Sequence, residues 1–244
     1  MTLKETKNTY DKFGKVYHKK RHNPKENFYN EYLEMPAISS LLKNIVKKKK
    51  VLDLGCGSGI FSKKLRSWGA KVTGIDLSKT LINIAQKENP EINFFVGNAE
   101  KTKFKNKEFD IVVSGLMLHY LKNLKKSFLE VSRILKNDGL FVFSMNHPVR
   151  EAVEGKIVKN KKVYFLKDYF KNKRTEWTMP PGITVVNYHH TFEEIVNTLN
   201  DAGFVVERLI EAKPVKGSEK YSKKDFELNM EYPSFLVIKA KKIK

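Results

Sequence analysis

The order of apolar segments predicts an α/β fold, a doubly wound and mostly parallel sheet with helices on both faces. Through residues 51–146, short apolar runs alternate with segments of helical periodicity. A cluster of glycines directly follows the first of these runs, where a parallel sheet can hold a ligand at the start of a helix. Because crossovers between parallel strands are right-handed, we expect that ligand at the carboxyl ends of the first strands, where the strand order reverses.

The expected elements succeed one another at short intervals. Apolar residues at helical spacing predict a helix over 29–46, which Pro36 kinks or splits. Ser78 is expected to cap one of the following helices, and the turn from Asn137 to Gly139 to end another. The remaining expectations are strands at 51–54, 71–75, 92–96, 109–114, 140–145, 204–210 and 234–239, and helices at 60–68, 78–87, 123–136 and 191–202.

Residues 147–190 interrupt this alternation. They contain a lysine-rich stretch and the turn sequence Met-Pro-Pro-Gly at 179–182, and we expect a small hairpin at 156–166. An irregular segment of this length in a compact domain is more often functional than a linker, so we interpret it as a lid or substrate-binding insertion after strand five. Residues 1–48 are then an N-terminal helical cap segment, and 49–244 form the core.

Length and composition are those of one cytoplasmic enzyme-sized domain. The 244 residues suffice for a substantial core, and no apolar run approaches the roughly 18 residues of a membrane helix. The N-terminus lacks the apolar region of a secretory signal. The single cysteine, Cys56, excludes an internal disulfide and fits a reducing compartment. We therefore expect a cytoplasmic location.

The formal net charge of +20 has two interpretations. A charge of this size can mark a nucleic-acid surface. Yet most of the basic residues are lysines scattered along the whole chain, and arginine, the preferred reader of phosphate and guanine, is scarce. The densest run, Lys47 to Lys50, precedes a buried strand, where a solvated turn explains it. Nucleic acid therefore stays the less favoured partner.

The spacing of the glycines separates two classes of cofactor. Gly55, Gly57 and Gly59 follow the first strand, and Ile60 stands where the dinucleotide fingerprint requires a third small residue. A branched side chain there would obstruct the close contact between helix and strand. Asp53, two residues before the first glycine, would repel a pyrophosphate but could meet an ammonium group. The pattern thus argues against a nicotinamide oxidoreductase.

A second acidic residue points to a ribose. Asp76 ends the second strand, about twenty residues after the glycines, where a carboxylate can accept two hydrogen bonds from ribose hydroxyls. Hydrogen bonds to a charged acceptor contribute about 1.5–3 kcal/mol each. A ligand with a ribose, an amino-acid group and no phosphate is S-adenosylmethionine.

Five segments together resemble class I, Rossmann-like S-adenosylmethionine-dependent methyltransferases of the small-molecule type. They are 51–59 around the glycines, 74–78 around the second acid, 96–100, 109–119, and the helix-to-strand turn 135–140. The resemblance covers residues 51–146. It implies a seven-stranded sheet whose last strand is antiparallel, and S-adenosylmethionine as the cofactor, converted to S-adenosylhomocysteine.

The resemblance also implies roles for the matched positions. The glycines approach the methionine moiety, and Asp53 either orients the loop, meets the ammonium group, or only stabilises the turn through loop amides. Asp76 holds the ribose and Leu77 packs on adenine. The remaining cofactor-binding positions are Asn98 and Ala99 beside the base, Ser114 behind the methionine end, and Cys56, which packs in the loop.

The N-terminal segment is the other candidate for a cofactor contact. It carries Tyr10, Tyr17, His18 and Arg21. In similar methyltransferases such a segment folds over the cofactor, which would make Tyr17 the contact. A simple surface helix is the equal alternative.

Chemistry requires few residues in such an enzyme. Methyl transfer from a sulfonium is an in-line displacement, in which positioning and desolvation supply much of the rate. A general base is needed only where the nucleophile arrives protonated, and histidine suits neutral pH. His119 and His147 follow the fourth and fifth strands and are the catalytic candidates, whereas His189 and His190 would belong to the lid. Each could equally be a hydrogen-bonded loop histidine, and no metal site is expected.

Three functions compete. A small-molecule acceptor is favoured, and the surplus of lysine favours an anionic one if the lysines face the cleft. An RNA methyltransferase, such as one acting on tRNA, stays open for ribose or wobble-base chemistry. Ser114 to Met117 replaces the Asn/Asp-Pro-Pro-aromatic motif of exocyclic amine methylation, and Cys56 is not free for the nucleophile that C5 methylation needs. A non-catalytic cofactor-binding partner subunit also stays open. Aromatic residues that could line an acceptor pocket or anchor the insertion are Tyr164, Trp177 and Tyr188.

Overall fold

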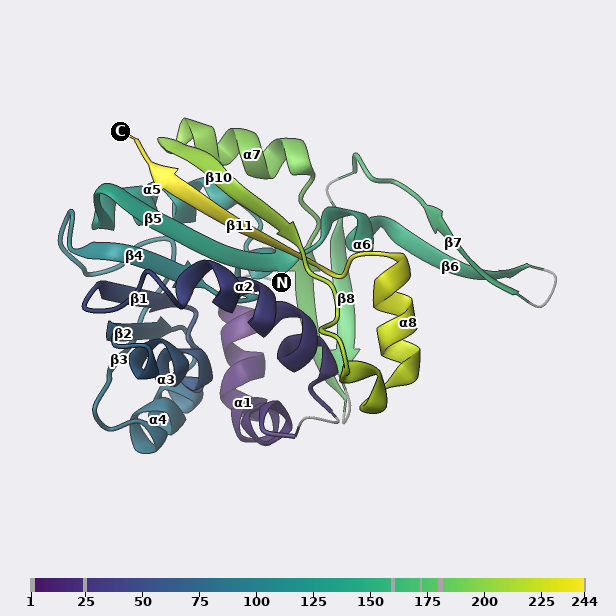
Figure 1. The fold of residues 1–244 in the computed structure, drawn as a ribbon, viewed down its shortest axis with the longest axis horizontal. Coiled ribbons are helices and arrows are strands. Elements are labelled where there is room, and N and C mark those ends of the chain that lie inside the picture. Colours follow the sequence, from purple (N-terminus) through teal and green to yellow (C-terminus); the bar gives the residue numbers. More distant parts are fainter. Residues whose placement is uncertain (1–2, 24–25, 159–160, 172, 180–181, 244) are drawn as a thin grey trace.

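One seven-stranded sheet organises the chain (Figure 1). The computed structural model describes residues 3–23, 26–158, 161–171, 173–179 and 182–243. The strand order is β10-β11-β5-β4-β1-β2-β3, and only β11 runs antiparallel to its neighbours. The strands are β1 (Lys50–Leu54), β2 (Lys71–Asp76), β3 (Asn93–Val96), β4 (Phe109–Ser114), β5 (Leu135–Asn146), β10 (Phe204–Glu211) and β11 (Phe235–Lys242). The predicted doubly wound sheet with an antiparallel last strand is confirmed.

Helices cover both faces because successive strand residues point to opposite sides. On one face Phe141 and Phe143 of β5 pack with Phe128 of α5 and Leu199 of α7. On the other face Val142 belongs to the cluster that buries the apolar sides of three further helices. The helices of the core are α2 (Met35–Leu42), α3 (Ile60–Ser67), α4 (Lys79–Glu88), α5 (Leu124–Ile134) and α7 (Phe192–Asp201).

Local signals place most helix ends where the sequence predicts them. The Ser78 hydroxyl accepts a hydrogen bond from the Leu81 amide, and Thr191 caps α7 in the same way. Pro36 stands in the first turn of α2, after a π-helical segment, η1 (Asn30–Glu34), so the expected kink falls between two helical forms. The helix before β5 was expected to run to the turn at Asn137. It ends at Ile134 instead, because Leu135 already pairs with Phe109 of β4.

The N-terminal segment forms the long helix α1 (Leu3–Arg21), which packs against α4. Asp11 holds it there: its carboxylate accepts hydrogen bonds from the Ser78 hydroxyl at 2.7 Å and the Thr80 amide at 3.2 Å. Gly14 allows the close approach, since a Cβ at this position would lie 3.0 Å from Thr80 Cγ2. The two helices are therefore joined through the cap of α4.

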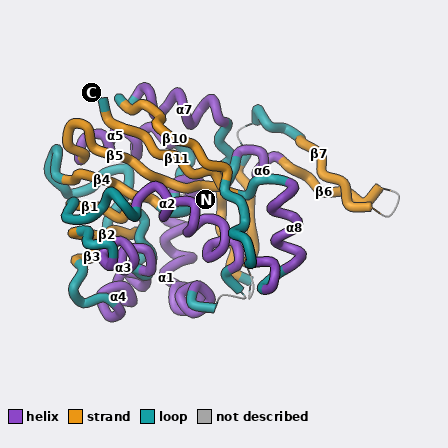
Figure 2. Tube along the Cα trace, viewed as in Figure 1, coloured by secondary structure: helices purple, strands orange, loops and turns teal. Residues whose placement is uncertain are grey.

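The insertion after β5 contains two separate hairpins. A short helix, α6 (Pro148–Ala152), leads into β6 (Val153–Val158) and β7 (Lys161–Leu166), which project from the body of the molecule (Figures 1 and 2). The hairpin expected at 156–166 thus begins three residues earlier. The second hairpin, β8 (Arg174–Met179) and β9 (Ile183–Tyr188), was not expected; β9 packs against α1 and the 3-10 helix η2 (Leu118–Tyr120). Pro180 and Pro181 of the predicted turn lie outside the described residues.

Two further elements precede the last strand, a 3-10 turn η3 (Ser218–Lys220) and the helix α8 (Lys223–Glu231), neither of which the sequence predicted. Across the described ranges, no helix combines the length and the apolar character that crossing a bilayer demands.

Candidate active site

Two adjoining cavities lie at the carboxyl edge of β1, β2 and β4. The first has a volume of about 720 Å³ and the second about 500 Å³. They share five lining residues, so one elongated ligand can span both. The shared residues are Tyr17, Gly55, Gly57, Gly115 and Leu116. The position agrees with the rule that ligands of open α/β sheets bind where the strand order reverses, here between β1 and β4.

Asp76 stands at the end of β2, in the wall of the first cavity. Its carboxylate accepts hydrogen bonds from the Gly57 amide at 2.9 Å and the Ser78 amide at 2.8 Å. Burial raises the pKa of Asp76 from its ordinary value, although these amides oppose the shift. Because an ionised carboxylate offers about four acceptor positions, two remain for a ligand. Asp76 thus fixes the glycine loop and can still bind hydroxyl groups.

The glycine loop approaches the cavities with its backbone alone. Gly55, Gly57 and Gly59 all have positive φ, the region that favours glycine. A Cβ on Gly55 would lie 2.5 Å from Met117 Cγ, so the loop after β4 packs directly on this glycine. Gly59 faces away from both cavities and allows α3 to approach Phe94 of β3 and Ala85 of α4. It therefore supports the loop and does not line the cavities itself.

The second cavity contains two buried carboxyl groups and one guanidinium. Asp53 is 2% exposed, and its carboxyl accepts a hydrogen bond from the Ser62 hydroxyl at 2.5 Å. Burial raises its pKa to about 7, and the carboxylates of Asp76 and Glu34 act in the same direction. Glu34, at the end of η1, is also buried, which raises its pKa, and it accepts a hydrogen bond from the Ser144 hydroxyl at 2.6 Å. Arg21, the last residue of α1, supplies the positive charge.

A family model and a solved structure indicate the same class of enzyme. Residues 52–143 match the family model described as "Methyltransferase domain". The chain has 27% identity and a TM-score of 0.77 to the crystal structure of an S-adenosylmethionine-dependent methyltransferase from Mesorhizobium loti, covering 86% of this chain and 97% of that one. The protein belongs to the S-adenosylmethionine-dependent methyltransferases.

Relatives of this methyltransferase differ in how much of the chain they match. An uncharacterized protein of Haemophilus influenzae is 31% identical over 250 residues, which cover 96% of this chain and 95% of that protein. A demethylmenaquinone methyltransferase of Chlorobaculum tepidum is 35% identical over 127 residues, covering 52% of this chain and 49% of that protein.

The cavities fit the cofactor of this class. Asp76 can take a ribose, and the carboxyls of the second cavity face an opposite charge, Arg21, as an ammonium and a carboxylate on one ligand require. Ser58 adds a buried hydroxyl in the second cavity that has no hydrogen-bond partner within the described part of the chain. A buried polar atom of this kind favours a polar ligand. S-Adenosylmethionine meets all of these conditions.

Most predicted cofactor positions line the two cavities. The first cavity is lined by Tyr17, Gly55, Gly57, Asp76, Leu77, Asn98 and Ala99. The second is lined by Tyr17, Gly55 and Gly57 again, together with Asp53 and Cys56. Ser114 is fully buried beside them and does not appear in either lining. Burial raises the pKa of the Cys56 thiol well above its ordinary value, so it stays protonated and is a poor nucleophile.

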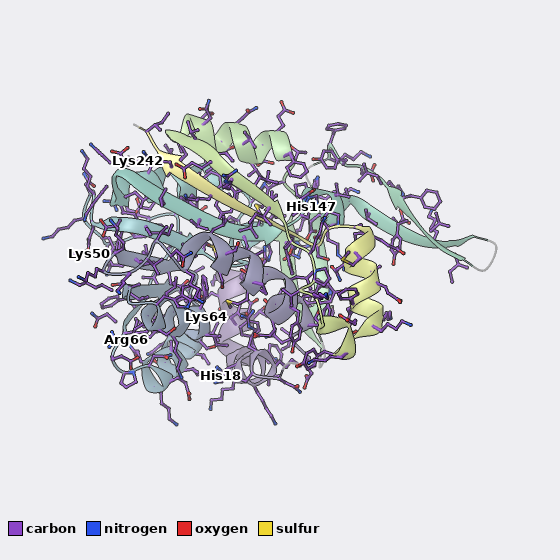
Figure 3. The ribbon with its side chains drawn as sticks, in the orientation of Figure 1. His18, Lys50, Lys64, Arg66, His147 and Lys242 are labelled. Carbon is purple, nitrogen blue, oxygen red and sulfur yellow. The ribbon has the colours of Figure 1, made fainter. Side chains whose placement is uncertain are left out.

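The predicted catalytic histidines lie outside both linings. His119 is 4% exposed, burial lowers its pKa to about 3, and its Nδ1 has no partner among the residues described. His147 lies between β5 and α6 (Figure 3) and caps α6 by accepting from the Val149 amide. Its Nε2 lies 3.1 Å from Glu211 Oε1. Burial lowers the pKa of His147 despite the Glu211 carboxylate. Their catalytic roles stay predictions.

His189 and His190 make hydrogen bonds within the insertion and at its edge. His189 Nε2 donates to the Tyr169 carbonyl at 2.7 Å, and His190 lies 2.9 Å from both the Glu194 carboxylate and the Leu121 carbonyl. Neither lines a cavity, and the same holds for the three aromatic candidates, Tyr164, Trp177 and Tyr188.

Among the cavity residues that sequence reasoning missed are Glu34, Lys7 and Tyr120. Glu34 lies in a segment predicted only as a helix, and Lys7 and Tyr120 reach the first cavity through the docking of α1 and η2. Tyr120 is adjacent to His119, so its position after β4 was the available signal. Nothing local distinguishes Glu34 from a surface glutamate.

Proposed function

We propose that this methyltransferase transfers a methyl group to a small-molecule acceptor by in-line displacement. The observation that carries the proposal is that helix α1 lines the site and narrows it. Helix α1 lines the first cavity with Leu3, Thr6, Lys7, Tyr10 and Tyr17, and β9 packs across α1 and η2. A lining of this kind favours a small acceptor, whereas polynucleotides are usually bound along an open basic groove.

The charge of the lining supports the same choice. Among the described residues that line the two cavities, Lys7 and Arg21 are the only cations, against Glu34, Asp53 and Asp76. The labelled cations Lys50, Lys64, Arg66 and Lys242 are spread over β1, α3 and β11 (Figure 3). The lining therefore gives no support to an anionic acceptor, and the proposal leaves the charge of the acceptor open. Several partial relatives act on small molecules by name, including the demethylmenaquinone methyltransferase.

The residues of the site would bind and orient the cofactor and the acceptor, and they would form no covalent bond with either. When bound, S-adenosylmethionine supplies a methyl group activated by a positively charged sulfur. Asp76 would hold the ribose, Leu77, Asn98 and Ala99 the base, and Asp53 and Arg21 the amino-acid end. Helix α1 would exclude water from the site, which strengthens electrostatic contacts inside it. The proposed roles of His119 and His147 concern proton acceptance from the acceptor and apply only to an acceptor that arrives protonated.

The test is calorimetric titration of the purified protein with S-adenosylmethionine and, separately, with NADH. Binding of the former alone is expected; binding of neither would overturn the proposal and favour a partner subunit without chemistry. Labelled methyl groups would then be followed into a small-molecule extract and into tRNA. Label in tRNA alone would replace the small-molecule acceptor with an RNA.

A further inference from the structure

Three tyrosines lie together in the wall of the first cavity, and one of them also lines the second. Tyr10 and Tyr17 lie seven residues apart on α1, two helical turns, and so share one face of the helix. Tyr120 comes from η2, on the loop after β4. All three line the first cavity, and Tyr17 lines the second as well. Two distant segments of the chain therefore build one aromatic cluster.

The neighbouring rings meet at large interplanar angles, edge to face, and are not stacked. The centroids of Tyr10 and Tyr17 are 5.3 Å apart with an interplanar angle of 82°, and those of Tyr10 and Tyr120 are 5.9 Å apart at 69°. The hydroxyls of Tyr10 and Tyr120 share a hydrogen bond of 2.7 Å, which fixes both rings. Each ring is half-buried and keeps surface for a ligand.

The phenols of Tyr10 and Tyr120 stay neutral. Burial raises the pKa of Tyr10 and of Tyr120 well above the ordinary value, and the nearby carboxylate of Asp76 acts in the same direction. A neutral tyrosine keeps its electron-rich ring face, which attracts a cation within about 6 Å of the centroid. The cluster thus offers aromatic faces beside an acidic group.

We propose that Tyr10, Tyr17 and Tyr120 form an aromatic cage that recognises the positive charge of the cofactor sulfur and so distinguishes S-adenosylmethionine from its uncharged product. The proposal rests on the proposed function. The sulfur is the atom that joins the ribose to the amino-acid chain. With the ribose at Asp76 and the amino-acid end in the second cavity, it lies at the junction that Tyr17 lines. Transfer of the methyl removes the charge, and with it the attraction that holds the ligand.

The test of the cage compares two ligands that differ in the charge of the sulfur and are similar in shape. Calorimetric titrations with S-adenosylmethionine and with S-adenosylhomocysteine give two dissociation constants for each variant. For Tyr17→Leu we expect S-adenosylmethionine to bind about three- to thirtyfold more weakly, and S-adenosylhomocysteine to change by less than about twofold. Tyr17→Phe keeps the ring face and is expected to keep the wild-type ratio of the two constants.

Tyr221→Leu is the matched control, because Tyr221 stacks on Tyr32 with centroids 4.6 Å apart and lines neither cavity. Thermal unfolding of each variant checks that it is folded. A second measurement avoids any change of volume: phenylalanine at position 17 is replaced by increasingly fluorinated phenylalanines, which lose electron density at the ring face. Affinity for the charged ligand should fall along the series while affinity for the neutral ligand stays level.

Equal weakening of both ligands in Tyr17→Leu, or no trend along the fluorinated series, would show that the rings only pack, and would overturn the cage. Wild-type protein that binds neither ligand would overturn the proposed function as well. The two failures are therefore distinguishable.

Discussion

The substitution Asp53→Asn should stabilise the cofactor-free protein against unfolding and lower its affinity for S-adenosylmethionine. Asp53 is 2% exposed, and its carboxyl has a pKa of about 7 because burial, with the nearby carboxylates of Asp76 and Glu34, disfavours the charged form. Above that pH the folded protein contains a buried negative charge with the Ser62 hydroxyl as its hydrogen-bond donor. Asparagine keeps the size and an acceptor oxygen and removes the charge.

The magnitude follows from the difference between the folded and unfolded pKa values. The Asp53 carboxyl has a pKa of about 7 in the folded protein and 3.8 in the unfolded chain. The free energy of unfolding therefore falls as the pH rises between these two values. About three pH units correspond to about 4 kcal/mol, an upper limit for what Asn can recover above pH 7. Below about pH 4 both states carry the neutral acid, and the gain should vanish. The stabilisation therefore grows as the pH rises above about 4 and reaches its full size above pH 7.

The assay is urea unfolding of both proteins at pH 5 and pH 8, followed by calorimetric titration with S-adenosylmethionine. At pH 8 we expect Asp53→Asn to unfold at a higher urea concentration than wild type, with a smaller difference at pH 5. The affinity of the wild type should fall up to about tenfold per pH unit below pH 7, because a protonated Asp53 no longer attracts the ammonium group. The variant should bind more weakly at pH 8 and lose this pH dependence.

Asp110→Asn is the control of opposite sign. Burial raises the pKa of Asp110, but the hydrogen bonds from Lys136 and from the Lys50 amide, with the charges of Lys136 and Lys49, together outweigh it and leave the pKa below its ordinary value. Its removal should therefore destabilise the protein at neutral pH and leave cofactor affinity unchanged. The reasoning about Asp53 is refuted if Asp53→Asn destabilises the free protein at pH 8, or if wild-type affinity is the same at pH 5 and pH 8.

Four other outcomes follow from the same geometry. Asp76→Asn should weaken S-adenosylmethionine binding more than about tenfold in calorimetry while the protein stays folded, because two charged hydrogen bonds are lost; unchanged affinity would refute the ribose contact. His119→Ala tests the predicted general base, which lies outside both linings and has a pKa of about 3: a fall in kcat at unchanged cofactor affinity would support that role, and an unchanged kcat would refute it. Gly55→Ala should unfold at markedly lower temperature by circular dichroism, since its Cβ would collide with Met117. Raising the salt concentration should leave cofactor affinity nearly unchanged, whereas steep weakening of tRNA binding would reveal a polynucleotide site.

Much of the fold could be predicted because its signals are local. The alternation of strands and helices from Val51 to Asn146 is visible as periodicity, and Asp53 and Asp76 reach the site because each ends or nears the end of a strand. Glu34 could not be predicted in this way. It reaches the second cavity because η1 and α2 pack over β5 and β11, where Ser144 binds its carboxylate. Such contacts depend on tertiary packing, which leaves no periodic trace in the sequence.

The net charge of the sequence says little about the acceptor, because it does not show which charged residues line the site. The chain carries +20, yet the two cavities are lined by three acidic and two basic residues. At physiological ionic strength charges are screened over about 8 Å, so distant surface lysines contribute little inside the site. A count of lysines also includes side chains that do not face solvent. Lys242 is 6% exposed, and its ammonium group donates to the carbonyls of Ser132 and Leu135. The field that a ligand meets is set by the few carboxylates that line the cavities, and these favour a cation at the cofactor sulfur.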